Sequence, residues 1–257
     1  MYKRQASTDG IAEFDLNSGG DGLTVDGISY TFPVSGATVL VGDTMDGSSL
    51  FSTACVYGGP SNTLDDCGNV NAAFVGGGTT LGVSYDFDNG FTAALGYSGS
   101  GDSSVGLMTS QGADSYGGNV AYTADTYGVS VTYAMVEDSN GVDDTYTALN
   151  AYWTPEGFPS ISAGYEWGDD GSAADATDEL TSYFVGIETG VGPGTAGAAL
   201  GTKTPTVEGS SELLMYEVFY SYPLNDGMSI TPLVYVKENA TGTNDETGVM
   251  VKTSFSF

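Results

Sequence analysis

The sequence predicts an all-β chain that forms an antiparallel transmembrane β-barrel. From residue 26 onward, segments of about ten residues alternate apolar and polar side chains. One such segment places Tyr127, Val129 and Val131 on one face and smaller or polar residues on the other. No apolar run reaches the roughly 18 to 20 residues of a membrane-spanning helix. Alternating strands would not produce such a run even in a membrane, because only every second side chain faces lipid.

Aromatic and β-branched residues are frequent in these segments, which is the usual strand signal. A length of roughly 9 to 11 residues suits a strand that crosses a bilayer at a tilt. Thirteen strands are expected, at 26–33, 36–43, 79–87, 91–98, 115–124, 127–136, 145–153, 160–167, 181–188, 195–202, 213–222, 228–236 and 247–257. Pro232 lies inside one of them, where it must remove a ladder hydrogen bond or sit at a bulge.

The connections between the strands alternate between short and long. The short connections contain turn-forming residues, including Pro33, Asp88-Asn89-Gly90 and Pro193. The long connections are 44–78, 99–114, 137–144, 168–180, 202–212 and 237–246, and most acidic residues fall in or next to them. Outer-membrane barrels show this asymmetry, with short periplasmic turns and long extracellular loops.

The N-terminal region does not fit the barrel pattern. Residues 1–5, MYKRQ, resemble the translation of a transposon end used in sequencing libraries, and we expect them to be an artefact on a truncated gene. A real chain that was cropped is the alternative. The rest, 6–257, is expected to be an N-terminally truncated barrel, with residues 6–24 forming an extracellular loop. Bacterial single-chain barrels have even strand numbers, so an odd count implies that at least one strand is missing upstream.

The charge balance excludes several classes of function. The chain has 33 acidic residues, 5 basic residues and no His. Nucleic-acid binding needs a basic surface and is not expected. Ser-His and Cys-His nucleophile pairs cannot form, so we expect neither an enzyme nor a cofactor. Acidic pairs such as Asp65-Asp66 and Asp143-Asp144 could bind calcium. None has the spacing of a defined calcium loop, so solvated loop charge is the preferred interpretation and no metal site is expected.

Two cysteines, Cys55 and Cys67, lie in a Gly/Asn/Asp-rich stretch within the longest connection. We expect them to form a loop disulfide in an oxidising compartment. Two unrelated free thiols are the alternative.

The last strand ends the chain with Val249, Val251, Thr253, Phe255 and Phe257 on one face. Such an ending resembles the signal that the outer-membrane barrel assembly machinery recognises, and we assign that role to Phe255 and Phe257. The segment from Glu217 to Phe257, including the stretch Tyr222 to Pro232, resembles the terminal hairpin of cyanobacterial outer-membrane porins. These belong with the carbohydrate-selective porins and are often labelled iron uptake porins.

This resemblance implies a passive diffusion pore for small hydrophilic solutes or inorganic ions. It implies location in the bacterial outer membrane, contact with lipid and lipopolysaccharide, and a homotrimer. It also suggests a parent barrel of about 16 strands, as in pore-forming barrels generally. In porins of that size, the loop at the position of 44–78 typically folds inward and narrows the pore. Asp65 and Asp66 are then expected at the constriction, and the disulfide on the loop that enters the pore.

Strand parity predicts which charged side chains line the pore. If Ile161, Tyr165 and Trp167 face lipid, Glu166 points inward, and the same reasoning places Glu188 and Glu217 in the lumen. The parity of Phe257 places Lys252 inside as well. Three carboxylates then face one ammonium, so a preference for cations is expected. Upstream strands carrying basic residues could reverse this balance.

Three other functions compete with the pore. A non-pore barrel, such as the translocator of an autotransporter, could share the terminal Phe, but it would carry a plug helix through the lumen. An outer-membrane enzyme is disfavoured by the absence of His. A secreted adhesive or surface-layer β protein remains the third alternative.

Overall fold

The computed structural model describes residues 13–16, 23–73, 77–100, 104, 106–109, 112–137, 142–171, 178–240 and 243–256. The strands are β1 (Glu13–Leu16), β2 (Leu23–Val34), β3 (Ala37–Met45), β4 (Gly78–Asp86), β5 (Phe91–Gly99), β6 (Asp114–Thr123), β7 (Tyr127–Glu137), β8 (Asp143–Trp153), β9 (Ser160–Asp169), β10 (Glu179–Val191), β11 (Gly194–Thr202), β12 (Thr206–Val207), β13 (Leu214–Asn225), β14 (Met228–Lys237) and β15 (Glu246–Phe255). A single turn of 3-10 helix, η1 (Gly47–Leu50), follows β3.

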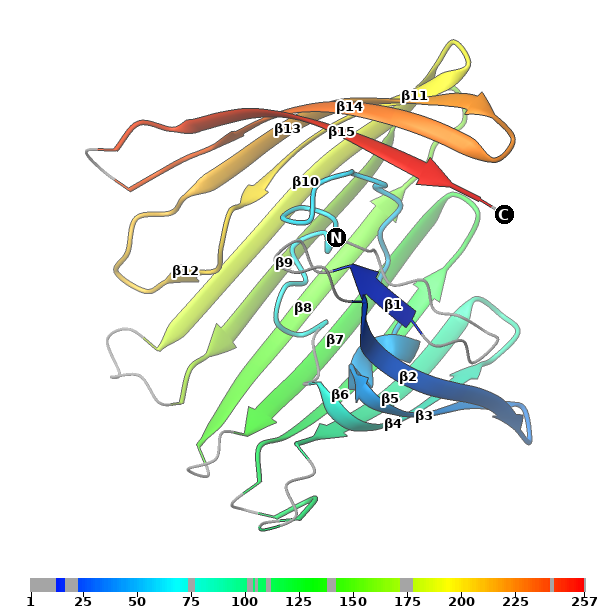
Figure 1. The fold of residues 1–257 in the computed structure, drawn as a ribbon, viewed down its shortest axis with the longest axis vertical. Coiled ribbons are helices and arrows are strands. Elements are labelled where there is room, and N and C mark those ends of the chain that lie inside the picture. Colours follow the sequence, from blue (N-terminus) through cyan, green and yellow to red (C-terminus); the bar gives the residue numbers. More distant parts are fainter. Residues whose placement is uncertain are drawn as a thin grey trace.

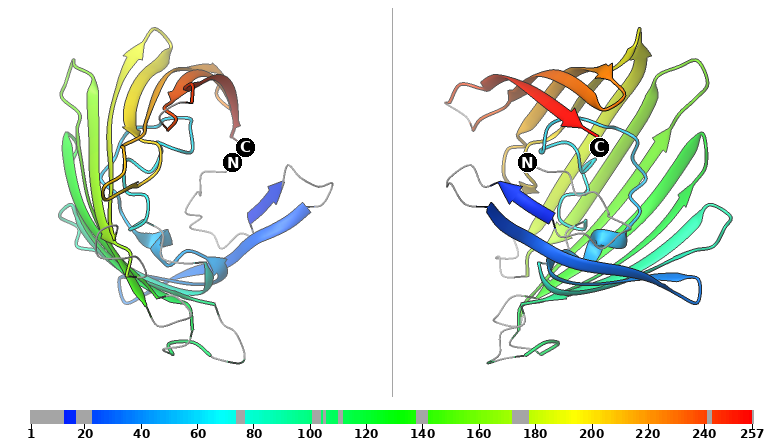
Figure 2. Two further views of the ribbon diagram at one scale, coloured as in Figure 1. Left: turned by 90° about the vertical axis from the view of Figure 1, so that its left-hand side faces the viewer. Right: turned by 45° about the vertical axis from the view of Figure 1, so that its right-hand side comes forward.

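The strands form one antiparallel sheet. Fourteen of them follow one another in chain order from β1 to β15, and β12 lies off this path and pairs with β10. The sheet curves strongly around the segment between β3 and β4 (Figures 1 and 2). The strand β1 at one end of the order and β15 at the other are the last strands of the sheet. The predicted antiparallel all-β fold is therefore confirmed.

The predicted rhythm of connections is also present. Short turns lie at one edge of the sheet and long connections at the opposite edge (Figure 1). The turn between β2 and β3 consists of Ser35 and Gly36, with φ of 50° and 89°. Two successive residues with positive φ suit a two-residue hairpin, because the twist of this turn matches the twist of the flanking strands.

All thirteen predicted strands are present, but one prediction for the N-terminal region is wrong. Residues 13–16 and 23–24 were expected in a loop; instead, residues 13–16 form β1, residues 23–24 begin β2, and the two strands pair over residues 23–27 of β2. The sequence Glu-Phe-Asp-Leu alternates polar and apolar residues, but four residues are too few to stand out as a strand signal. The rest of the expected loop, residues 6–12 and 17–22, and the suspected artefact, residues 1–5, lie outside the described residues.

The two faces of the sheet show an inverted distribution of side chains. Large apolar side chains on one face are exposed, including Leu95, Val131 and Val218. On the opposite face, buried positions include many polar residues, among them Thr80, Ser98, Ser130, Ser162 and Ser182. We call the first the outer face and the second the inner face. A water-soluble sandwich would instead bury its apolar face, so this pattern suits a sheet whose outer face does not meet water.

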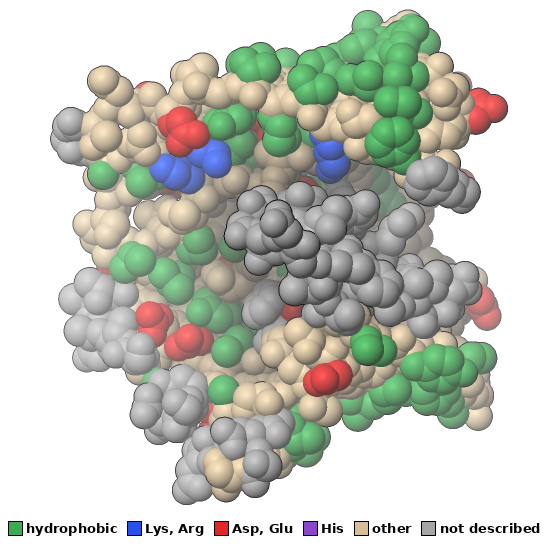
Figure 3. Space-filling view, in the orientation of Figure 1, with side chains coloured by type: hydrophobic (Ala, Val, Ile, Leu, Met, Phe, Trp, Pro, Cys, Tyr) green, Lys and Arg blue, Asp and Glu red, His purple; other side chains and the backbone are tan. Residues whose placement is uncertain are grey.

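Aromatic side chains gather toward the strand ends. Near the short turns, Phe91 and Tyr122 lie with ring centroids 4.8 Å apart, and Tyr122 lies 5.7 Å from Tyr127. Toward the long connections, Tyr165 and Trp167 form a further pair, at 6.0 Å. Hydrophobic side chains also gather at the right-hand ends of the upper and lower strands in Figure 3, where the β2–β3 and β13–β14 hairpins turn. Within the part of the chain that the structure describes, no helix is long and apolar enough to cross a membrane.

Pro232 interrupts the ladder, as its missing N–H requires. Pairing between β13 and β14 is regular up to Phe219 and Leu233 and resumes at Tyr222 and Ile230 in the same register. Thr231 and Pro232 lie in the gap between these two stretches. There the Thr231 hydroxyl donates a hydrogen bond to the Ser221 hydroxyl at 2.9 Å. This side-chain bond replaces part of the backbone hydrogen bonding that is missing between the two strands.

Candidate functional site: the inner loop and the wall beneath it

The connection between β3 and β4 folds back onto the inner face of the sheet. We call residues 46–77 the inner loop, of which 74–76 are not described. It begins with η1 and then runs across the strands inside the curve of the sheet (Figure 2). Its polar contacts with the wall fall into an outbound segment (residues 52–58) and a return segment (residues 67–72), with a tip (residues 59–66) between them.

The outbound segment is bonded to the wall through its backbone. The N–H groups of residues 52, 54 and 56 donate to Asn119 Oδ1 at 2.9 Å, Ser130 Oγ at 2.9 Å and Ser162 Oγ at 3.0 Å. These acceptors lie on β6, β7 and β9. Alternate N–H groups of an extended chain point to the same side. The wall side chains therefore satisfy a row of donors that a loop in this position would otherwise leave buried and unpaired.

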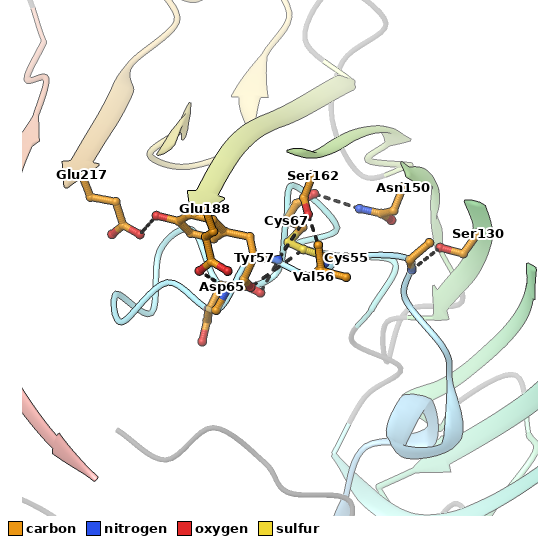
Figure 4. Close-up of a disulfide and its surroundings, with 12 residues drawn as sticks. Cys55, Val56, Tyr57, Asp65, Cys67, Ser130, Asn150, Ser162, Glu188 and Glu217 are labelled. Carbon is orange, nitrogen blue, oxygen red and sulfur yellow. Dashed lines mark hydrogen bonds between the residues drawn. A yellow bond between two sulfur atoms is a disulfide. The ribbon is translucent and has the colours of Figure 1, made fainter. Parts of the chain in front are cut away.

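The end of the outbound segment, next to the tip, is held by two carboxylates from the wall. The Gly58 N–H donates to Glu188 Oε1 on β10 at 2.8 Å. The Tyr57 hydroxyl donates to Glu217 Oε1 on β13 at 2.6 Å (Figure 4). Burial, reinforced by the hydrogen bond to Glu217, raises the pKa of Tyr57 well above its ordinary value. Tyr57 therefore remains a hydrogen-bond donor at any physiological pH.

An apolar cluster lies beneath the tip. The Tyr57 ring packs 5.1 Å from the Phe184 ring and 5.8 Å from the Phe219 ring, measured between centroids. Leu64 is buried in the same cluster, and Met215 and Leu233 complete it from β13 and β14. The inner face is therefore polar under the outbound segment and apolar under the tip, so the loop is anchored by two different kinds of contact.

The return segment is bonded mainly through Glu166 of β9. This carboxylate accepts hydrogen bonds from the Asn71 N–H at 2.8 Å, the Asn71 amide side chain at 2.9 Å and the Ala72 N–H at 2.7 Å. Asn150 Nδ2 on β8 donates to the Cys67 carbonyl oxygen at 2.8 Å. Several N–H donors on one buried carboxylate make short, charge-assisted bonds, the stronger kind of hydrogen bond.

A disulfide joins the two segments. Cys55 on the outbound segment is bonded to Cys67 on the return segment, with Cα atoms 6.4 Å apart (Figure 4). Cys67 is fully buried against the wall. The disulfide therefore joins two stretches of the inner loop that are each hydrogen-bonded to the wall.

The predicted lumen carboxylates point inward, but two of them are covered. Glu166 and Glu217 are each 2% exposed, because the inner loop lies on them. Glu166 and Glu217 were predicted to line a pore, and this requires correction, because both are covered and their hydrogen-bond partners are atoms of the inner loop. Glu188 is half-buried.

The other predicted residues have different surroundings. Asp66 is exposed and Asp65 is half-buried, both at the end of the loop tip. Lys252 on β15 is half-buried and attracts the Glu217 carboxylate electrostatically. Phe255 is 59% exposed, on the same face as Val249 and Val251. Phe257 lies outside the described residues.

Sequence reasoning missed the wall residues that receive the loop. Asn119, Ser130, Asn150 and Ser162 occupy inward positions of strands and read as ordinary polar residues of an alternating pattern. Asparagine inside a strand is unfavourable by propensity, and this is the one signal that could have marked two of them. Among the described residues, no group of three or more Cys, Asp or Glu side chains is placed to hold a metal ion.

The chain is similar in fold to solved structures, but no match was found at the level of sequence. No family model and no curated protein matches the sequence. Among solved structures, an anion-selective porin from Comamonas acidovorans is similar with a TM-score of 0.65 at 16% identity, covering 92% of this chain and 79% of that one. A loop-deletion mutant of OmpT, an outer-membrane protein of Vibrio cholerae, gives a TM-score of 0.67 at 14% identity, with coverage of 96% and 84%. A mutant of Rh. blastica porin gives 0.62 at 16% identity, with coverage of 95% and 82%. The chain therefore has the fold of bacterial porins.

Proposed function

We propose that the chain forms a passive pore for small hydrophilic solutes and inorganic ions in the bacterial outer membrane. This proposal rests on two observations together: the sheet has an apolar outer face and a polar inner face, and a loop is hydrogen-bonded across that inner face. An apolar outer face suits lipid, and a polar inner face suits water. A loop on the inner face narrows the space through which solutes pass without closing it by a folded plug.

The outer face supports a location in the membrane. Its exposed apolar side chains continue around the sheet, and aromatic rings lie toward the strand ends. Tyr and Trp prefer the headgroup depth of a bilayer, because their rings are apolar and their tips are polar. Phe255 on the outer face of β15 fits the proposed recognition by the barrel assembly machinery.

A homotrimer, in contact with lipid and lipopolysaccharide, is part of the same proposal. A mass measurement in detergent that finds only monomers would refute the trimer.

We assign the pore a preference for cations, carried by the acidic residues that remain accessible. The chain has a formal net charge of −28. With Glu166 and Glu217 covered, Asp65, Asp66 and Glu188 present carboxylates at and beside the loop tip, and Lys252 opposes them. A low-dielectric wall focuses such a field and raises the local concentration of cations. The similarly folded Comamonas porin is described as anion-selective, so this fold is compatible with either sign and the side chains decide.

Two measurements in reconstituted membranes test the proposal. Liposomes containing the protein should swell in small sugars, with rates that fall as the sugar becomes larger; no swelling above empty liposomes would refute the pore. In a planar bilayer with a KCl gradient, the reversal potential should show cation preference.

The variant Asp66→Asn combined with Glu188→Gln should weaken that preference. Asp88→Asn combined with Asp226→Asn, which removes two charges at short turns, is the matched control and should leave the preference nearly unchanged. Anion preference of the unmodified protein, or equal effects of the two sets of substitutions, would refute the assignment of these carboxylates.

A further inference from the structure

Three glycines on the inner face lie directly beneath the inner loop. Gly96 is on β5, Gly164 on β9 and Gly186 on β10. Their backbone is ordinary strand, since none of them is among the glycines of the chain with positive φ. A turn or a left-handed conformation therefore does not explain them. A glycine inside a strand weakens it and often marks a place where another backbone approaches closely.

The loop occupies the space that a side chain would need at each of these positions. A Cβ at Gly96 would overlap the carbonyl group of Gly47, at the start of η1. A Cβ at Gly164 would overlap the carbonyl oxygen of Cys67. A Cβ at Gly186 would lie 2.6 Å from Tyr57 Cδ2 of the loop and equally close to Phe184 Cζ of the wall. The start of the loop, its return segment and the base of its tip each lie on a different glycine.

Neighbouring polar contacts fix the loop at this depth. Asn150 Nδ2 reaches the Cys67 carbonyl oxygen at 2.8 Å, beside Gly164. Two positions from Gly186 on β10, Glu188 accepts a hydrogen bond from the Gly58 N–H. Two positions from Gly164 on β9, Ser162 accepts one from the Val56 N–H. Because these bonds have ordinary lengths, the loop cannot rise from the wall without stretching them.

We propose that Gly96, Gly164 and Gly186 are the size-determining residues of the pore, because they set how deeply the inner loop sinks into the wall. The inference rests on the proposed pore function and names the residues that fix its free width. An added methyl group protrudes by about one C–C bond, ~1.5 Å. Alanine at these positions raises the loop into the lumen by a comparable distance, although no charged or lumen-exposed side chain is changed.

The test compares Gly96→Ala and Gly164→Ala with Gly190→Ala. Gly190 is the matched control because it lies on β10 with the same parity as Gly186, and nothing lies within 4 Å of a Cβ there. Single-channel conductance and liposome swelling in sugars of increasing size are measured for each protein. Hydrogen–deuterium exchange of loop peptides is measured in parallel, because it reports the loop–wall bonds whether or not the protein conducts.

Both test variants should lose conductance and exclude sugars that the unmodified protein admits, while cation preference stays unchanged. In the Gly164→Ala variant, exchange should be faster in the return segment. The control should match the unmodified protein. If Gly164→Ala does not fold, Gly96→Ala carries the test, since the three atoms nearest to the added methyl all belong to Gly47 of the loop. Conductance equal to or above that of the unmodified protein would overturn the inference. An unmodified protein that does not conduct would refute the pore instead, and exchange equal to that of the control would then overturn the loop displacement as well.

Discussion

The outer and inner faces of a single strand in this protein follow opposite rules of burial. On β10, Val185 and Ile187 are 43% and 45% exposed, whereas Phe184 is 1% and Ser182 is 0% exposed. The difference does not come from a core between two sheets. Among the described residues, the inner loop lies on the inner face, whereas the large apolar side chains of the outer face stay exposed. Residues of the inner face are therefore buried because the loop lies on them. The exposed apolar residues of the outer face instead need an apolar environment outside the protein.

The largest effect is expected from a charge on the outer face. In lipid, Val185→Arg at the centre of β10 should destabilise the protein by about 2–4 kcal/mol, since that is the cost of Arg at the bilayer midplane of a barrel. Thr189→Arg, on the same face but closer to the short turn, should cost about 0–1 kcal/mol. Urea unfolding in lipid vesicles measures both. Equal costs for the two variants would show that the outer face does not meet a hydrocarbon layer.

On the inner face, removal of the main bond to the return segment should have the next largest effect. Glu166→Ala leaves the N–H groups of Asn71 and Ala72 without their acceptor, at a cost of about 1.5–3 kcal/mol for lost bonds to a charged group. Hydrogen exchange should accelerate in residues 67–72. Glu188→Ala is the comparison, because this half-buried carboxylate accepts a hydrogen bond from the Gly58 N–H at the end of the outbound segment. Equal acceleration of exchange in the return segment by both substitutions would contradict the role of Glu166 as its main anchor.

A smaller effect, confined to the loop, is expected when the disulfide is removed. Without the bond between Cys55 and Cys67, the outbound and return segments remain hydrogen-bonded to the wall but are no longer joined to each other by a covalent bond. The double variant Cys55→Ala and Cys67→Ala should give noisier single-channel currents, with the circular dichroism of the sheet unchanged. Quiet currents in the double variant would mean that the hydrogen bonds to the wall alone hold the loop.

The two faces also differ in how far the sequence predicts them. The strands and the outward parity of Tyr165 and Trp167 follow from local alternation, which a single segment contains in full. The covering of Glu166 and Glu217 does not, because it depends on partners far along the chain. Ser130 and Ser162 meet the loop across 76 and 106 residues of sequence. Nothing in the local pattern distinguishes a polar side chain that meets water from one that meets a backbone N–H.

The central claim is that the inner loop narrows an aqueous pore through the curved sheet, and shortening the loop tests it most directly. In this variant a short turn replaces residues 47–77, so that β3 and β4 form a plain hairpin. Single-channel recording in a planar bilayer should show discrete, ohmic steps for the unmodified protein and larger steps for the shortened one. Steps of equal size would contradict a constriction at the loop, and the absence of steps from the unmodified protein would contradict the pore itself.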